Sequence, residues 1–314
     1  MTAYLVRRLL LVIPTLLVVM LLVFSILRLL PGDVVKLMVA EQNYAADEDA
    51  MRRELGLDKP VPVQFAQWTG DVLTGNFGKS LWTKQSIAAE LRNRFPVSIE
   101  LGVFAVLIGL LIALPTGVIS AVRQDGWLDY GARSFAIFLI SVPGFWLATL
   151  LLVLPLIWWG WTPPLKYVGF RESPLRNLYY FFWPALLLGA GLSGVTLRLM
   201  RNQMLEVLRQ DYVRTAHAKG LAERAVISRH ALKNALIPVV TVIGLQVGFV
   251  VSGTVIFETI FGVPGIGRFY FQAINFRDYP AVQATALFIA LTILLTNLVV
   301  DLAYAVIDPR IRYT

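Results

Sequence analysis

The sequence has no cysteine and only two histidines among its 314 residues. The lack of cysteine excludes disulfides, thiolate zinc or iron–sulfur sites and a cysteine nucleophile. His217 and His230 do not belong to a His-Glu-x-x-His pattern, and their cationic neighbours disfavour a metal ion. A Gly-x-Ser-x-Gly nucleophile turn is also missing. The sequence therefore predicts neither a catalytic residue nor a metal ligand.

Charged residues are also scarce, at 15% of the chain, whereas 57% of the residues are hydrophobic. In soluble globular domains about a quarter of the residues are charged, so this composition indicates a membrane protein. Six charge-free runs of at least 19 residues are close to or above the length that crosses the hydrocarbon core of a bilayer as a helix. The predicted transmembrane helices cover approximately 9–29, 100–122, 134–158, 180–199, 236–258 and 281–304.

These runs predict an all-α integral membrane protein. A membrane β-barrel needs strands in which polar and apolar residues alternate, and the runs show no such alternation. The first run follows Arg7 and Arg8, as the core of a secretory signal would. It is longer than a typical signal core, however, and the residues around Pro31 and Gly32 form a poor cleavage site. We therefore predict that this run is a retained helix.

Lysine and arginine are distributed unevenly between the loops, and this distribution predicts the orientation. The segment 198–233 has eight Lys or Arg residues against three Asp or Glu, which favours the cytoplasmic side. The segment 31–95 has eight basic and nine acidic residues and is assigned to the outside. Six spans then place both termini in the cytoplasm. This topology accounts for the net charge of +8 without a nucleic-acid partner, because the aromatic residues lie mostly in the spans or their flanks.

The external segment after the first span has about 65 residues, more than an ordinary connection needs. Its apolar spacing predicts short amphipathic helices over 47–55, 63–73 and 87–94. Trp68 and Trp82 are consistent with a segment that lies on the membrane surface. A small cap that packs on the helix bundle is an equally good interpretation.

Two glycine-containing stretches resemble nucleotide-binding loops only in part. The stretch 78–80, Gly-Lys-Ser, has Leu73 where a phosphate-binding loop requires a glycine. The stretch 262–267 has no βαβ unit around it, and we predict a turn after the fifth span that leads into a short external helix over 268–276. Neither stretch is expected to bind a nucleotide.

Ionisable residues inside a membrane often mark ion or proton pathways. Those in this chain are few and lie near span ends, where pairing or snorkelling explains most of them. They are Arg28, Glu100, Arg133, Glu258 and Asp301. An ion-coupled secondary carrier would place carboxylates or broken helices at mid-depth. Pro115, Pro143 and Pro155 interrupt the spans, so such a carrier is the main alternative. A membrane-embedded enzyme is a third class, but no set of catalytic residues supports it.

The loop between the fourth and fifth spans has a helical pattern of its own. Val213, Ala216 and Gly220 fall on one helical face, and Gly220 can adopt the left-handed conformation that ends a helix. A second helix is predicted to begin near Glu223. A helix of about ten residues is marginal alone in water, so it must dock on another surface. The spacing leaves two choices: the groove of a partner protein, or the inner leaflet with the arginines on lipid phosphates.

Seven distinctive short motifs are spread along nearly the whole chain. They are LLPGD at 29–33, LGLDKP at 55–60, GNFGKS at 75–80, DYVRTA at 211–216, FGVPGIG at 261–267, RDYP at 277–280 and DPRIR at 308–312. The loop TAHAKG at 215–220, with Ile237-Pro238 behind it, resembles the cytoplasmic signature loop of permeases in binding-protein-dependent ABC importers. Thr215 and His217 depart from that signature, which has Glu and Ala there. The chain is similar to the B-type permease subunit of dipeptide and oligopeptide importers, a group whose relatives carry nickel, opines and glutathione.

The resemblance implies a type I ABC importer permease fold in a bacterial or archaeal cytoplasmic membrane. It implies a transmembrane helix with an external segment at 1–95, a transmembrane core at 96–308 and a cytoplasmic tail at 309–314. The implied partners are a second homologous permease subunit, two ATP-binding cassette ATPase subunits, an extracytoplasmic binding protein that delivers peptides, and membrane lipids. ATP and magnesium would bind the ATPase subunits, while this chain would bind no cofactor and act as no enzyme.

The motif also assigns residues to two contact regions. The ATPase-coupling loop would comprise Tyr212, Val213, Thr215, Ala216, His217, Lys219 and Gly220, flanked by Glu223 and Arg224. The loop that faces the binding protein would contain Gly262, Pro264, Gly265 and Gly267. ATP-driven closure of the ATPases would move the coupling helix, and the spans would follow.

Overall fold

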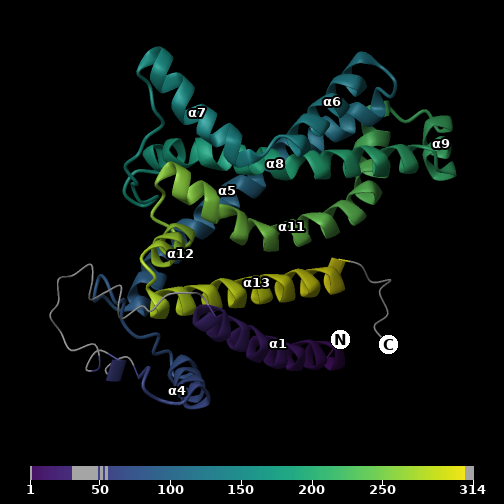
Figure 1. The fold of residues 1–314 in the computed structure, drawn as a ribbon. Helices are drawn as coiled ribbons and strands as arrows, with labels where there is room; N and C mark the ends of the chain where they lie inside the picture. The colour runs from purple at the N-terminus through teal and green to yellow at the C-terminus, as the bar shows by residue number, and fades with distance from the viewer. Residues whose placement is uncertain (1, 30–48, 50–51, 54–55, 308–314) are drawn as a thin grey trace. The chain divides into compact units, whose positions relative to one another are not determined.

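The computed structural model describes residues 2–29, 49, 52–53 and 56–307, and the regular elements in these residues are helices (Figure 1). The predicted all-α class is therefore confirmed. Contacts divide the chain into two compact units, which are described separately below. One unit comprises Met1–Phe95 and Phe269–Leu294, and the other comprises Pro96–Arg268 and Leu295–Thr314.

The larger unit is organised around α8, Pro174–Leu208, against which α6 and α11 pack most extensively. Glycines let the helices approach closely, because a Cβ at Gly109 of α5 would lie 2.9 Å from the Gly189 oxygen of α8. The unit contains most of α5 (Ile87–Val122), then α6 (Trp127–Ser141), α7 (Gly144–Trp159), α8, α9 (Asp211–Ala218), α10 (Glu223–Ala225), the π-helical turn η1 (Val226–Ala231) and α11 (Leu232–Phe261). Its apolar core includes Leu101, Phe181, Leu188 and Phe257.

The smaller unit contains α1 (Thr2–Leu29), α4 (Val61–Leu73), the first turns of α5, most of α12 (Ile266–Asn275) and the first part of α13 (Tyr279–Ile307). Aromatic rings hold α1 to α4, with the Phe24 and Phe65 centroids 5.1 Å apart. Two stretches distant in sequence also meet, because Ser80 Oγ donates a hydrogen bond to Asp278 Oδ2 at 2.5 Å. The motifs at 75–80 and 277–280 thus have a shared structural role.

Four helices in the described residues are long and apolar enough to cross a membrane, or five if a bent pair counts as one span. They are Ile87–Val122, Pro174–Leu208, Glu223–Gly248 and Tyr279–Val300, with Trp127–Ser141 and Gly144–Trp159 as the pair. Leu10–Ser25 is a shorter apolar helix. The helices extend well beyond the charge-free runs, since α5 has 36 residues and α8 has 35. The turns that carry charged residues before and after the charge-free runs therefore belong to the same helices.

The third span predicted over 134–158 falls on a bent pair of helices. Helices α6 and α7 are separate and meet at an angle of 91°. Val142 is extended, with ψ 123°, and Pro143 caps the start of α7. Proline disfavours a helical residue before it and has no N–H to donate, which explains the break at this point.

The expectations for the external segment have mixed outcomes. The helix predicted over 63–73 is confirmed as α4. The separate short helix predicted over 87–94 is wrong, because these residues form the first turns of α5, which continues through Pro96. Most of the helix predicted over 47–55 lies outside the described residues. The turn and short helix predicted after the fifth span are confirmed as α12, which begins two residues earlier than expected.

Candidate functional site

The loop between α8 and α11 forms a defined helix-turn-helix. Helix α9 begins at Asp211, an acidic residue that favours a helix N-terminus, and ends at Ala218, two residues before Gly220, whose φ is 75°. The Gly220 N–H donates to the His217 oxygen at 2.9 Å and the Leu221 N–H to the Ala216 oxygen at 3.4 Å. This pair of bonds is the Schellman arrangement that a left-handed glycine permits. The predicted role of Gly220 is confirmed.

The apolar face of α9 packs on its own chain. Val213 and Ala216 are 1% and 5% exposed, and they share a buried cluster with Met200, Met204 and Val226. We expected this face to dock on a partner or on lipid, but α8 and η1 already cover it. Burial of a valine side chain contributes about 2 kcal/mol, so this contact holds α9 against the ends of the two long helices.

A polar contact supplements the apolar one. Asn234 Nδ2 donates to Tyr212 Oη at 2.9 Å and to the His230 oxygen at 3.0 Å, and Tyr212 Oη donates to the same oxygen at 3.4 Å. Tyr212 lies on α9, whereas His230 and Asn234 lie on η1 and α11. Helix α9 is therefore fastened to the fifth-span helix by side-chain hydrogen bonds as well as by its apolar face.

The second helix after Gly220 begins at Glu223, as predicted, but it is not short. It runs through α10 and η1 into α11 without a break, and Pro238 lies inside α11. The wider π-helical turn at Val226–Ala231 contacts α9. The residues after Gly220 and helix α11 thus form one contiguous helical segment from Glu223 onward.

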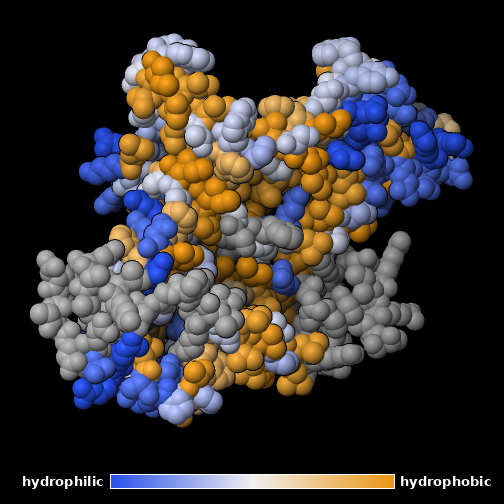
Figure 2. All heavy atoms as spheres, in the orientation of Figure 1, coloured by the Kyte–Doolittle hydropathy of each residue, from blue (hydrophilic) through white to orange (hydrophobic). Residues whose placement is uncertain are grey.

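The outward side of this loop is polar and exposed. Figure 2 shows hydrophilic spheres gathered around α9, whereas hydrophobic spheres cover much of the helices further along the same unit. Thr215 bonds within the helix, since its hydroxyl donates to the Asp211 oxygen at 2.9 Å. His217 Nδ1 lies 3.1 Å from the Val213 oxygen. The exposed members of the predicted coupling loop are Tyr212, Thr215, His217, Lys219, Gly220, Glu223 and Arg224.

The stretch 262–267 is held by buried polar contacts of its own chain. Glu258, fully buried at the end of α11, accepts the Arg268 N–H at 3.0 Å through Oε2. Ser98 Oγ accepts the Ile266 N–H at 2.8 Å. Gly262 has φ 69° and ends α11. The carboxylate near the end of the fifth span therefore positions this loop.

The glycines of this loop are required by packing. A Cβ at Gly265 would overlap the Glu258 carboxylate and the Ser98 hydroxyl, and one at Gly267 would overlap Val255. Of the four residues expected to face a binding protein, only Gly262 and Pro264 are partly exposed. The surface that this loop offers to a partner is therefore much smaller than the motif suggests.

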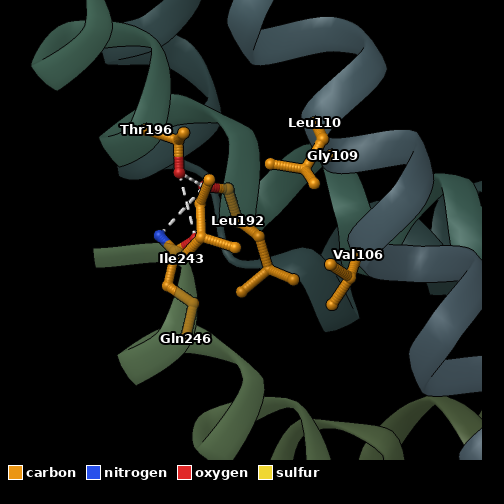
Figure 3. Close-up of a pocket in the computed structure, with 7 residues that line it drawn as sticks. All are labelled: Val106, Gly109, Leu110, Leu192, Thr196, Ile243 and Gln246. Carbon is orange, nitrogen blue, oxygen red and sulfur yellow. Dashed lines mark hydrogen bonds between the residues drawn. The ribbon is translucent and has the colours of Figure 1, made fainter. Parts of the chain in front are cut away.

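A small pocket lies where α5, α8 and α11 meet (Figure 3). Gln246 points toward Thr196, whose hydroxyl donates to Gln246 Oε1 at 3.0 Å, and Gln246 Nε2 donates to the Leu192 oxygen at 3.2 Å. The pocket has room for about one water molecule, too little for a peptide. It is lined by Val106, Gly109, Leu110, Leu192, Thr196, Ile243 and Gln246.

One ion pair of this unit was not anticipated. Arg201 of α8 donates from Nε and Nη2 to the two carboxylate oxygens of Asp129 in α6, both at 2.6 Å. Arg201 counts among the basic residues of the segment 198–233, and the sequence predicts no role for Asp129. The residues are 72 positions apart, so spacing gives no signal for their contact. Among the described residues no group of His, Cys, Asp or Glu could hold a metal ion.

Comparison with known proteins agrees with this arrangement. Residues 113–313 match the family described as binding-protein-dependent transport system inner membrane component, and residues 1–102 match its N-terminal membrane component family. The chain belongs to this family of membrane permeases. The expectation of an ABC importer permease, whose ATPase is a separate subunit, is thereby confirmed.

Full-length relatives carry peptide transport names. The chain is 40% identical over 313 residues to a putative peptide transport system permease protein of Brucella abortus, with all of both chains covered. It is 41% identical over 335 residues to the di/tripeptide transport system permease protein DppB of Pseudomonas aeruginosa, covering 100% of this chain and 99% of the relative. A structure of the MetNI methionine ABC transporter is similar in fold, with a TM-score of 0.57 at 15% identity, covering 70% of this chain and 96% of that one.

Proposed function

We propose that this chain forms half of the translocation pathway of an ATP-driven importer of dipeptides and oligopeptides. The observation that carries the proposal is the exposed helix α9, which is anchored by buried residues to two long apolar helices. An exposed helix that is rigidly joined to spans is suited to transmit a movement from a water-soluble partner. The peptide class rests on the names of the full-length relatives.

We place the ATPase contact on the outward side of α9. Val213 and Ala216 serve as anchors, because their side chains are buried against α8 and η1. Thr215, His217 and Lys219 are left to meet the groove of an ATPase subunit, with Glu223 and Arg224 beside them. This assignment modifies the motif-based expectation by dividing the coupling loop into an inner and an outer face.

The membrane topology is part of the proposal. We count six spans, with the bent pair α6 and α7 as the third and α1 as the first, in a type I importer arrangement. Both termini and α9 lie in the cytoplasm, and the segment 31–95 lies outside. The proposed division remains 1–95, 96–308 and 309–314. The exposed edges of Gly262 and Pro264 support a limited contact with the binding protein.

The remaining partners follow from the same mechanism. A second homologous permease would complete the pathway, two ATPase subunits would bind ATP and magnesium, and an extracytoplasmic binding protein would supply the peptide. This chain would bind no cofactor itself. The bacterial inner membrane is the proposed location, consistent with the family description.

The proposal is tested by co-expressing the chain with ATPase, partner permease and binding-protein subunits from the same organism and reconstituting the purified complex in liposomes. We expect uptake of labelled di- and tripeptides that requires ATP and the binding protein. Uptake by this chain alone, driven by a proton or sodium gradient without ATP, would instead establish a secondary carrier. Binding of a metal chelate but no peptide to the cognate binding protein would overturn the peptide class.

A further inference from the structure

The ion pair between Asp129 and Arg201 is buried in the larger unit and extensively hydrogen-bonded. Asp129 is 0% exposed and accepts both guanidinium bonds at 2.6 Å. It also accepts the Ser120 hydroxyl at 2.6 Å and the Asp125 N–H at 3.0 Å. All four acceptor positions of the carboxylate are thus used. Such bidentate, charge-assisted contacts are short and specific in geometry.

These bonds join three helices and a turn. Ser120 lies at the end of α5, Asp125 in the turn after it, Asp129 in the first turn of α6 and Arg201 on α8. The guanidinium side chain is only 14% exposed. Removing one member of a buried pair leaves the other charge uncompensated, which is far more costly than losing a surface salt bridge. The geometry therefore favours an ion pair that stays formed.

Arg201 also adjoins the anchor of the coupling helix. Its neighbour Met200 and the following turn, with Met204, are fully buried in the cluster that holds Val213 and Ala216. The same stretch of α8 thus contacts α9 through apolar side chains and α6 through Arg201. Figure 1 shows α6 and α9 beside the same end of α8.

Helix α6 remains fastened to α8 further along its length. Ala136 and Leu197 lie in one buried cluster, and a Cβ at Gly194 would lie 3.1 Å from the Ala136 oxygen. Helix α6 ends before Val142 and Pro143, and α7 then continues at 91° to it. The bend between α6 and α7 therefore lies directly after the part of α6 that packs on α8.

We propose that the Asp129–Arg201 pair is a positioning clamp that makes α6 move with α8 and α9, so that displacement of α9 is passed to the bend between α6 and α7. This inference rests on the proposed function, because it takes α9 as the point where ATPase movement enters. Asp129 and Arg201 are positioning residues. They transmit movement and touch no substrate.

The first test uses conservative variants in the complete reconstituted transporter. Asp129→Asn keeps the size of the side chain and Arg201→Lys keeps its charge. Each variant removes the bidentate pair. We expect peptide uptake per ATP hydrolysed to fall about tenfold, while assembly with the ATPase subunits and basal hydrolysis stay within about twofold. Matched controls are Asp125→Asn, where asparagine tolerates the φ of 60°, and exposed Arg198→Lys. Both controls should behave as wild type.

The alternative outcomes are separable. If assembly falls but uptake per ATP is unchanged in the complexes that form, the pair is only structural and the clamp is rejected. If wild type and both controls show no ATP-dependent uptake, the proposed function fails instead. Equal uptake per ATP in the variants and in wild type would also reject the clamp.

A second test uses the lack of cysteine in this chain. The double variant Asp129→Cys/Arg201→Cys can be joined by a short bifunctional thiol reagent without any background reaction within the chain. Before cross-linking we expect the double variant to hydrolyse ATP with little peptide uptake. After cross-linking we expect peptide uptake per ATP hydrolysed to recover to within about threefold of wild type. The single-cysteine variants, treated with the same reagent, should not recover. If the pair must open in each cycle, cross-linking would lower uptake further, and the clamp would be wrong.

Discussion

Asn234 and Tyr212 are joined by a hydrogen bond of 2.9 Å from the amide nitrogen to the phenol oxygen, across the turn that separates α9 from the helix that begins at Glu223. Both groups also bond the His230 oxygen. Because Asn234 belongs to α11, this triangle joins α9 to α11 in addition to the buried apolar cluster. Helix α9 is thus held to its own chain by a polar contact and by an apolar one.

Loss of the tyrosine hydroxyl should weaken this connection. Tyr212→Phe keeps the ring and removes both bonds of the hydroxyl, a change of about 1 kcal/mol. We expect peptide uptake in liposomes to fall about threefold relative to ATP hydrolysis. The matched control is Tyr130→Phe on α6, an exposed tyrosine whose ring lies under the Arg133 guanidinium. An equal loss in both variants would show that the Tyr212 contact has no special role.

The two faces of α9 should respond differently to the same substitution. Val213→Asp places a carboxylate in the apolar cluster, costs several kcal/mol and should release α9, so that limited proteolysis cleaves at Arg214 or Lys219. Thr215→Asp places the same charge on the exposed face, so α9 should resist the protease as in wild type. Thr215→Asp should instead reduce co-purification of the ATPase subunits. Protease sensitivity in Thr215→Asp, or full resistance in Val213→Asp, would contradict the division into inner and outer faces.

Glycines at the two loops should differ in their tolerance of alanine. Gly220 has φ 75° and open space around its Cβ position, so Gly220→Ala should cost about 1 kcal/mol from backbone strain alone. Gly220→Asn should recover most of this loss, because asparagine adopts the left-handed conformation more readily. Gly265→Ala would collide with Glu258 and Ser98 and should cost about 3 kcal/mol. Thermal unfolding in detergent measures the stability of all three variants. A larger loss for Gly220→Ala than for Gly265→Ala would refute this ranking.

Local features of the fold could be predicted from the sequence. The helical pattern of 211–218, the glycine that ends it and the start of the next helix at Glu223 are all present in the structure. Each depends on residues within one or two turns of each other. The amphipathic helix α4 and the turn before α12 were found for the same reason.

Features that depend on distant contacts could not be predicted. The spacing of Val213 and Ala216 is the same whether the helix docks on a partner or on its own chain, so the pattern identified a docking face but not its occupant. Likewise, Asp129 and Arg201 are too far apart in sequence for spacing to link them. Pro143 was noted as an interruption, but its consequence, a 91° bend, depends on how α6 and α7 pack on other helices.

The orientation in the membrane can be tested with single cysteines, because the chain has none of its own. Lys219→Cys lies after α9 on the proposed cytoplasmic side, and Gln85→Cys lies in the proposed external segment; both positions are exposed. A membrane-impermeant maleimide should label Gln85→Cys in intact inner-membrane vesicles of right-side-out orientation and label Lys219→Cys only after permeabilisation. Ala113→Cys, fully buried, is the negative control for both conditions. The reverse labelling pattern would invert the topology, and α9 could then not meet an ATPase in the cytoplasm.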